Sequence, residues 1–272
     1  MPQNNPDIDR FLTEARAAAR EAGDIQLASY GSAIAVSRKG DINLVTEVDR
    51  HCERAIVDRL QVAFPDHGIL AEEGSGKETR SGYRWVIDPL DGTTNYAHGY
   101  PRFCVCIALE LEGTTLLGVV LDPVLDEEFV AVRGSGATLN GRPIRVSKNS
   151  EMLQSLLATG FAYDIRENPD NNLDYFAAFI LSARAVRRDG SAGLNLCYTA
   201  MGRFDGFWEM QLHPWDVAAG SLMVREAGGM VTDFEGGPNE MDGSRIVASN
   251  GHLHREMLEI IRKTRNASGR TQ

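Results

Sequence analysis

The amino-acid sequence predicts a mixed α/β fold, because segments with helical periodicity alternate with short apolar runs that are typical of strands. Stretches 7–29 and 46–64 carry apolar residues at the spacing of an amphipathic helix, whereas 103–146 alternates apolar runs with glycine turns. From residue 155 onwards, strand and helix patterns follow one another. With 272 residues, of which 43% are hydrophobic and 24% charged, the chain can form one extended domain or two closely packed ones.

The helices are predicted from apolar spacing together with start and stop signals. Residues 7–29 place alanine, leucine, isoleucine and phenylalanine on one helical face. Thr46-Glu47-Val48-Asp49 has the form of a capping box, and it predicts a second helix that ends at Pro65. Further helices are predicted over 173–183 and 252–262, and another begins at Pro214.

The strands are predicted from short apolar or alternating runs between turn residues. Glu112-Gly113 and Asn140-Gly141 are typical hairpin turns, so the middle of the chain should form an antiparallel meander. The polar, glycine-rich stretch 74–82 is expected to be a loop and a candidate mobile cover. The predicted strands cover 33–37, 42–45, 67–71, 85–87, 104–111, 116–121, 128–132, 143–146 and 155–160.

A shift in composition around 147–151 is the best candidate for an internal boundary. We therefore predict an N-terminal α+β subdomain over 1–147, which holds the antiparallel sheet and the motif discussed below. A C-terminal α/β subdomain over 148–272 is expected to complete the functional site.

Charge and hydropathy narrow the possible functions. The formal net charge of −10 argues against a nucleic-acid surface, although bound metal ions would still allow a small phosphorylated ligand. The sequence has no apolar run of membrane-spanning length and no signal-peptide pattern at its N-terminus, so no membrane association and a cytoplasmic location are expected. Four cysteines without Cys-x-x-Cys spacing favour buried free thiols over a zinc site or a disulfide.

The richest stretch is 85–96, which reads Trp-Val-Ile-Asp-Pro-Leu-Asp-Gly-Thr-Thr-Asn-Tyr. Its apolar start predicts the end of a buried strand, and Pro89 is expected to stop the strand because proline donates no hydrogen bond. Asp88 and Asp91, together with the acidic pair at 72–73, would repel each other unless a cation neutralised them. Hard carboxylate oxygens suit Mg²⁺. Each piece also has a simpler interpretation, since Asp-Gly is a common turn and paired glutamates are common on surfaces.

The same stretch closely resembles the signature of the inositol monophosphatase family of magnesium-dependent, lithium-sensitive phosphatases. Further segments resemble family motifs in the same order and extend the resemblance over about 10–262, although Asn43 stands where the family often has Asp. These segments are Asn-Leu-Val-Thr-Glu-Val-Asp at 43–49, Ala-Glu-Glu at 71–73, Gly-Ser-Ala at 190–192 and Trp-Asp-Val-Ala-Ala-Gly at 215–220.

The resemblance implies a layered α-β-α-β-α sandwich of the sugar-phosphatase type, usually found as a homodimer. It also implies metal ligands. One Mg²⁺ would be held by Glu72, Asp88 and the backbone carbonyl of Leu90, and a second by Asp88, Asp91 and Asp216. A weaker third ion at Glu72 would help to activate the attacking water.

The remaining roles are likewise implied by the resemblance. Thr93 and Asp49 would orient the water and receive its proton, with Glu72 assisting, and the backbone N–H groups of Gly92 and Thr93 would hold the phosphate. Asp91, Ala192, Glu209 and Asp216 would contact the substrate. From local sequence alone, Asp49 and Asp216 are equally typical of helix first turns, and Glu209 of an edge-strand charge.

The implied activity is hydrolysis of a phosphate monoester by metal-activated water, and we expect myo-inositol monophosphate as the substrate, a small phosphorylated polyol or sugar. Fructose 1,6-bisphosphate, histidinol phosphate and nucleotide 3′-phosphates remain alternatives, because one fold can serve several chemistries. Glu209 favours a polyol, whereas Arg187 or Arg188 in the cleft would permit a bisphosphate. A regulatory binding protein built on the same fold is a further alternative.

Overall fold

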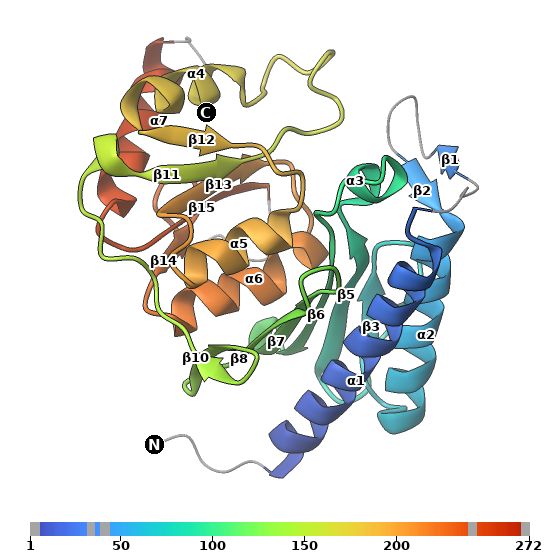
Figure 1. The fold of residues 1–272 in the computed structure, drawn as a ribbon. Coiled ribbons are helices and arrows are strands. Elements are labelled where there is room, and N and C mark those ends of the chain that lie inside the picture. The colour runs from blue at the N-terminus through green and yellow to red at the C-terminus, as the bar shows by residue number, and fades with distance from the viewer. Residues whose placement is uncertain (1–5, 32–35, 39–43, 239–243, 268–272) are drawn as a thin grey trace.

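The computed structural model describes residues 6–31, 36–38, 44–238 and 244–267, and its helices and strands stack in five layers (Figure 1). Two helices cover one face of a large sheet, two more lie between this sheet and a smaller one, and the last pair covers the far side. The predicted α-β-α-β-α sandwich is therefore confirmed. Asn43 and much of the predicted hairpin at 33–45 lie outside the described residues.

The larger sheet has eight strands, and its pairs are antiparallel except for β3 with β5. Positive φ angles at Glu112 and Gly113, and again at Asn140 and Gly141, confirm both predicted hairpin turns. In spatial order the strands are β10 (Arg142–Pro143), β9 (Gly136–Leu139), β8 (Glu127–Val132), β7 (Thr114–Asp122), β6 (Cys104–Leu111), β5 (Tyr83–Asp91), β3 (Gly68–Ala71) and β4 (Gly76–Lys77).

The first outer layer consists of α1 (Pro6–Ser29) and α2 (Glu47–Ala63), which pack on one face of the large sheet. Strand alternation decides which side chains they meet. Val105 and Ile107 of β6 join the core beneath these helices, whereas Cys104 and Cys106 join the core on the opposite face. Next to this layer, β1 (Val36–Arg38) and β2 (Leu44–Thr46) form a small antiparallel pair.

The middle layer consists of α5 (Ala192–Ala200) and α6 (Pro214–Glu226), and small residues bring it close to the large sheet. A Cβ atom added to Gly118 of β7 would lie 2.9 Å from the Cα atom of Ala219 on α6. One added to Gly220 would lie 2.5 Å from the Cβ atom of Leu196 on α5. The small residues of the 215–220 motif therefore permit close packing.

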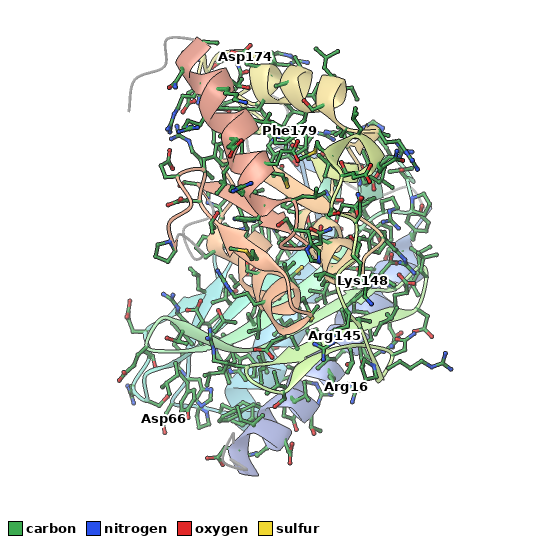
Figure 2. All side chains as sticks on the ribbon, turned by 90° about the vertical axis from the view of Figure 1, so that its left-hand side faces the viewer. Arg16, Asp66, Arg145, Lys148, Asp174 and Phe179 are labelled. Atoms are coloured by element: carbon green, nitrogen blue, oxygen red, sulfur yellow. The ribbon has the colours of Figure 1, made fainter. Side chains whose placement is uncertain are left out.

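The smaller sheet has five strands, β12 (Ala185–Arg187), β11 (Leu156–Thr159), β13 (Gly206–Met210), β15 (Arg245–Ser249) and β14 (Met230–Thr232), in that spatial order. Its outer face packs against α4 (Leu173–Ser182) and α7 (His254–Ala267), where Phe179 of α4 stacks on Trp208 with ring centroids 4.0 Å apart. Figure 2 shows Phe179 in the upper part of the molecule and Arg16 of α1 in the lower part. Two short helices, α3 (Thr93–Ala97) and the 3₁₀ helix η1 (Met152–Gln154), complete the described elements.

Some sequence predictions were wrong in detail. Pro89 does not end its strand, because β5 continues to Asp91 through a bulge that needs no N–H from proline. The predicted loop 74–82 contains β4, which pairs with β3. Strand β9 was missed, and the strand predicted over 143–146 is shorter, since pairing ends at Pro143. The division at residue 147 stays a prediction.

No helix in the described part of the chain combines the length and hydrophobicity that a bilayer-spanning segment needs.

The contact between Gly118 and α6 gives a stability prediction. Gly118→Ala should lower the free energy of unfolding by about 1–3 kcal/mol, because the added methyl group meets helix backbone that no side-chain rotation can move. Gly76→Ala is the matched control, since nothing lies within 4 Å of a Cβ atom added there. Denaturant unfolding of both variants measures the difference. Equal stabilities would show that the middle layer has room to move.

Candidate active site

The acidic residues of the 71–73 and 85–96 motifs meet where two parallel strands end. Ala71 of β3 lies opposite Ile87 of β5, and the next residues along the chain are Glu72 and Asp88. The Glu72 N–H group donates to the Ile87 carbonyl at 3.2 Å, which fixes the separation of the two strand ends. Carboxylates that were 16 positions apart in the sequence are thereby brought to one edge of the sheet.

The bulge between Asp88 and Asp91 turns two carboxylates of one strand toward the same site. The Leu90 N–H group donates to Oδ1 of Asp88 at 2.9 Å, and Nε2 of Gln26 on α1 donates to the Pro89 carbonyl at 2.8 Å. Asp91 then returns to the sheet opposite Cys104. In a regular strand, residues three positions apart point to opposite faces of the sheet, so Asp88 and Asp91 would not share one site without the bulge.

Asp91 is held by the N-terminus of α5. Oδ2 accepts hydrogen bonds from Ser191 Oγ at 2.6 Å and from the Gly193 N–H at 2.7 Å, and the Ala192 N–H donates to Oδ1 at 3.3 Å. These donors and the helix dipole favour the charged carboxylate. Burial acts in the opposite direction and is the larger effect, so the pKa of Asp91 is raised.

Asp88 and Asp216 have more strongly raised pKa values. Burial is the first cause for Asp88, followed by the charges of Glu72, Asp91 and Asp216. Burial and the Asp91 charge raise the pKa of Asp216, although the His213 N–H group donates to its Oδ2 at 2.6 Å. Asp216 lies in the first turn of α6, as predicted. The shared cause, mutual repulsion of negative charges, is what a bound cation relieves.

Thr93 connects this cluster to α2. Its Oγ1 atom lies 3.0 Å from Oδ1 of Asp49 and 3.1 Å from the Leu90 carbonyl oxygen. Asp49 is 1% exposed. Gly92 precedes α3 with φ 98°, and a Cβ atom there would lie 2.8 Å from the Arg102 carbonyl oxygen. Glycine is required at this position by both the backbone conformation and the space.

These side chains face a cavity of about 690 Å³ between the two sheets' ends. Asp49 alone among the predicted site residues does not line it, and reaches it through Thr93. The other predicted residues that line the cavity are Glu72, Asp88, Leu90, Asp91, Gly92, Thr93, Ala192, Glu209 and Asp216.

Glu209 of β13 enters the cavity from the smaller sheet. Burial, followed by the charges of Asp216 and Asp91, raises its pKa to about 8, while Arg188 acts in the opposite direction. Its place depends on Gly160, because a Cβ atom there would lie 2.0 Å from Oε1 of Glu209. Arg188 lines the cavity and Arg187 is exposed, which answers a question that the sequence left open.

The donor set fits a hard divalent cation. Four carboxylates and the Leu90 carbonyl supply only oxygen ligands, and this chemistry is typical of Mg²⁺, Ca²⁺ or Mn²⁺. The raised pKa of Asp88 supports the same conclusion, since burial and three neighbouring carboxylates disfavour its charged form.

Sequence reasoning missed several residues that shape the site. Glu53 of α2 is buried, and its carboxylate accepts the Glu73 N–H at 2.7 Å and the Ser75 N–H at 3.0 Å, which fixes the turn after Glu72. Ser191 could have been found as a helix N-cap. Tyr163, Asp164 and Arg166 also line the cavity, from a connection between β11 and α4 that has no motif of its own.

Comparison with known proteins gives the same class of protein as the fold and the site. A model of the inositol monophosphatase family matches residues 7–268, so the chain belongs to this family. The family and the phosphatase class predicted from the sequence motifs are confirmed.

Individual relatives are similar over nearly the whole chain. Inositol-1-monophosphatase of Synechocystis sp. is 42% identical over 95% of this chain and 91% of its own length. Nus factor SuhB of Pseudomonas aeruginosa is 45% identical over 92% of this chain and 95% of its own. Among solved structures, inositol monophosphatase from Anabaena (Nostoc) matches with a TM-score of 0.87 and 43% identity, covering 94% of this chain and 97% of that one.

The raised pKa of Glu209 predicts how stability depends on pH without metal. The carboxyl binds a proton in the folded state up to about pH 8, but in the unfolded chain only up to about pH 4.3. Between these values the folded state holds more protons, so its stability falls as pH rises, by about 1.4 kcal/mol per pH unit for one group. Glu209→Gln should therefore flatten the decline between pH 5 and 8 by about this slope.

The measurement is denaturant unfolding in EDTA across this pH range. Glu256→Gln, which removes an exposed carboxylate from α7, is the control and should keep the wild-type slope. A Glu209→Gln slope equal to that of wild type would contradict a protonated Glu209.

Proposed function

We propose that this chain hydrolyses a phosphate monoester, with myo-inositol monophosphate as substrate and Mg²⁺ as the metal. The observation that carries the proposal is the convergence of Glu72, Asp88, Asp91 and Asp216 on one cavity. Four carboxylates that repel one another favour a bound metal ion, and metal ions beside a phosphate provide an activated water and charge stabilisation.

The chain's own residues would divide the work as the family motifs imply. Glu72, Asp88 and the Leu90 carbonyl would hold one ion, and Asp88, Asp91 and Asp216 a second. The contact between Thr93 Oγ1 and Asp49 is suited to orient a water and to receive its proton, because it joins a hydroxyl at the cavity to a buried acid. The Gly92 and Thr93 N–H groups would hold the phosphate oxygens.

The substrate end of the cavity supports a polyol. Glu209 can accept hydrogen bonds from hydroxyl groups, and Asp91, Asp216 and Ala192 also line this cavity. Arg188 and Arg166 also line this cavity and add positive charge. A bisphosphate therefore stays among the alternatives, with histidinol phosphate and nucleotide 3′-phosphates.

A second candidate role is that of a regulatory binding partner, which the relative named Nus factor SuhB favours. The intact carboxylate set supports catalysis in addition to such a role. The two are separable: Asp88→Asn should abolish turnover, and a partner role that is independent of catalysis should survive in this variant. Loss of both together would mean that any partner role depends on turnover.

We further propose that the protein is cytoplasmic and, as the family resemblance implies, a homodimer. We also propose that it does not bind nucleic acid, since its net charge is −10. Sedimentation that gives the mass of one chain would contradict the dimer. Retention of the protein on DNA or RNA at physiological salt would contradict the proposal that it does not bind nucleic acid.

Asp88→Asn tests the metal site and the activity together. The variant removes the bridging charge, so without metal it should melt at or above the wild-type temperature. Mg²⁺ at 100 times its dissociation constant should add about 2.7 kcal/mol per ion to wild type, or about 5–10 °C, and much less to the variant. Phosphate release from inositol monophosphate should need Mg²⁺ in wild type and be almost lost in the variant.

Thermal melts and phosphate release, with EDTA and with Mg²⁺, make the comparison. The alternative substrates are assayed in the same panel. Asp58→Asn removes an exposed carboxylate from α2 and should behave as wild type. A full Mg²⁺ shift in Asp88→Asn would overturn the proposed ligand set, and Mg²⁺-independent turnover, or turnover of none of the substrates, would overturn the proposed function.

The proposed site should be sensitive to lithium. Li⁺ is close to Mg²⁺ in size, so it can enter a carboxylate site but leaves the product phosphate without the charge needed for the next cycle. Hydrolysis at saturating Mg²⁺ should fall in high millimolar LiCl and stay unchanged in the same concentration of NaCl. Equal rates in the two salts would contradict a lithium-sensitive site.

A further inference from the structure

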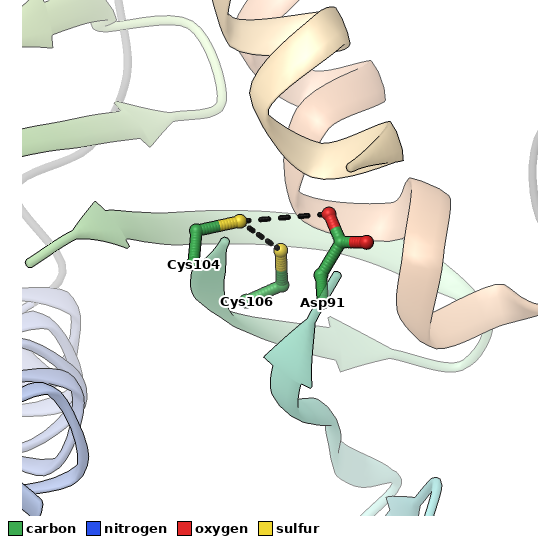
Figure 3. A group of neighbouring side chains, drawn as sticks. All are labelled: Asp91, Cys104 and Cys106. Carbon is green, nitrogen blue, oxygen red and sulfur yellow. Dashed lines mark hydrogen bonds between the residues drawn. The ribbon is translucent and has the colours of Figure 1, made fainter. Parts of the chain in front are cut away.

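On β6, next to the carboxylates of β5, two cysteines lie side by side, with Cys104 opposite Asp91 and Cys106 opposite Asp88. Cys104 and Cys106 are alternate residues of β6, so both side chains point to the same face, and their sulfurs are 3.7 Å apart (Figure 3). Cys104 Sγ lies 3.5 Å from Oδ2 of Asp91. The three donor atoms are within 4.8 Å of one another. All three residues are buried.

We propose that Asp91, Cys104 and Cys106 form a binding site for a thiophilic divalent cation such as Zn²⁺, separate in chemistry from the all-oxygen site. A tetrahedral zinc ion with Zn–S bonds of about 2.3 Å and a Zn–O bond of about 2.0 Å keeps its sulfurs about 3.8 Å apart and each sulfur about 3.5 Å from the oxygen. The observed separations of 3.7 and 3.5 Å match two of these edges. The third edge, between Cys106 Sγ and the Asp91 oxygen, is within 4.8 Å, so an ion could bind here once these two atoms close to about 3.5 Å.

The fourth position has a candidate ligand. Ser191 Oγ lies 3.6 Å from Cys104 Sγ, close to the same tetrahedral spacing, and Ser191 also lines the cavity. A water from the cavity could take this position instead. Gly193 packs directly on the sulfurs, and only glycine fits there because a Cβ atom would lie 2.5 Å from Cys106 Sγ.

Binding at this site must displace two protons. Burial raises the pKa of the Cys104 thiol, and the hydrogen bond with Cys104, followed by burial, raises the pKa of Cys106, so each thiol is protonated before the cation arrives. Each Zn–S bond forms as the thiol proton passes to the buffer, and Asp91 is already an oxygen donor. Mg²⁺ does not compete for this position, because thiolate sulfur is a soft ligand and Mg²⁺ prefers oxygen.

Occupancy would affect the proposed magnesium site through Asp91, and this consequence rests on the proposed function. A cation at Oδ2 would compete with the hydrogen bonds that Ser191 and Gly193 donate to this atom and weaken them. The Mg²⁺ concentration for half-maximal hydrolysis should then rise about tenfold, the usual size when outer partners of a metal ligand are disturbed.

Co²⁺ is the probe for the site itself, because thiolate–cobalt bonds give a near-ultraviolet charge-transfer band that carboxylate ligands do not. The fully reduced, full-length protein is titrated with Co²⁺ at saturating Mg²⁺. We expect this band with one ion per chain, and Zn²⁺ should remove it by displacement. Absence of the band in wild type would overturn the proposal, whether or not the protein is a phosphatase.

Variants assign the band to its ligands. Cys104→Ser and Cys106→Ser should each lose about half of the band or all of it, since one or both Co–S bonds are missing. Cys197→Ser is the matched control, because it removes another buried thiol, from α5, and should keep the band. If Cys104→Ser or Cys106→Ser does not fold, the titrations of wild type and of Cys197→Ser still test the proposed site. A band that survives in both β6 variants, or disappears in Cys197→Ser, would contradict the assignment.

Discussion

Mutual repulsion among the carboxylates around Asp88 is the constraint on which the rest of this structure depends. Two like charges about 5 Å apart repel by about 3 kcal/mol at an effective dielectric constant of 20, and Asp88 has three acidic neighbours that raise its pKa. The folded chain compensates with backbone donors. Asp88 accepts the Leu90 N–H, Asp91 accepts donors from the start of α5, and Asp216 accepts the His213 N–H. These donors reduce the repulsion but leave a net negative cavity that a divalent cation can complete.

Such donors are available only where secondary structure ends, and this explains the position of the site. Strand ends and helix N-termini carry N–H groups that no backbone partner uses. Glu72 follows β3, Asp88 and Asp91 flank a bulge in β5, and Asp216 lies in the first turn of α6. The parallel pair of β3 and β5 matters most, because it turns two strand ends toward the same cavity in a sheet that is otherwise antiparallel.

Local signatures in the sequence predicted both hairpin turns and the convergence of the acidic residues at 72–73, 88 and 91, whereas the layered fold was implied by the family resemblance. The 85–96 stretch combines strand, turn and helix signals within twelve residues. Glu53 could not be predicted, since an acid on a helix gives no sign that it will accept N–H groups from a turn 20 residues away. Pro89 was misjudged for a related reason: whether a proline ends a strand or lies in a bulge depends on the neighbouring strand. Only the tertiary structure shows that Arg188, and not Arg187, lines the cavity.

The middle helical layer links the stability of the fold to the geometry of the site. Gly118 allows α6 to lie against β7, and Gly220 allows α5 to lie against α6. Because of this packing, the start of α5 comes close enough for the Gly193 N–H group to reach Asp91 at 2.7 Å. A larger residue at Gly118 would therefore be expected to move donors away from Asp91 as well as to reduce stability. The small residues of this layer act at a distance on the charge balance of the carboxylates, although none of them carries a functional group.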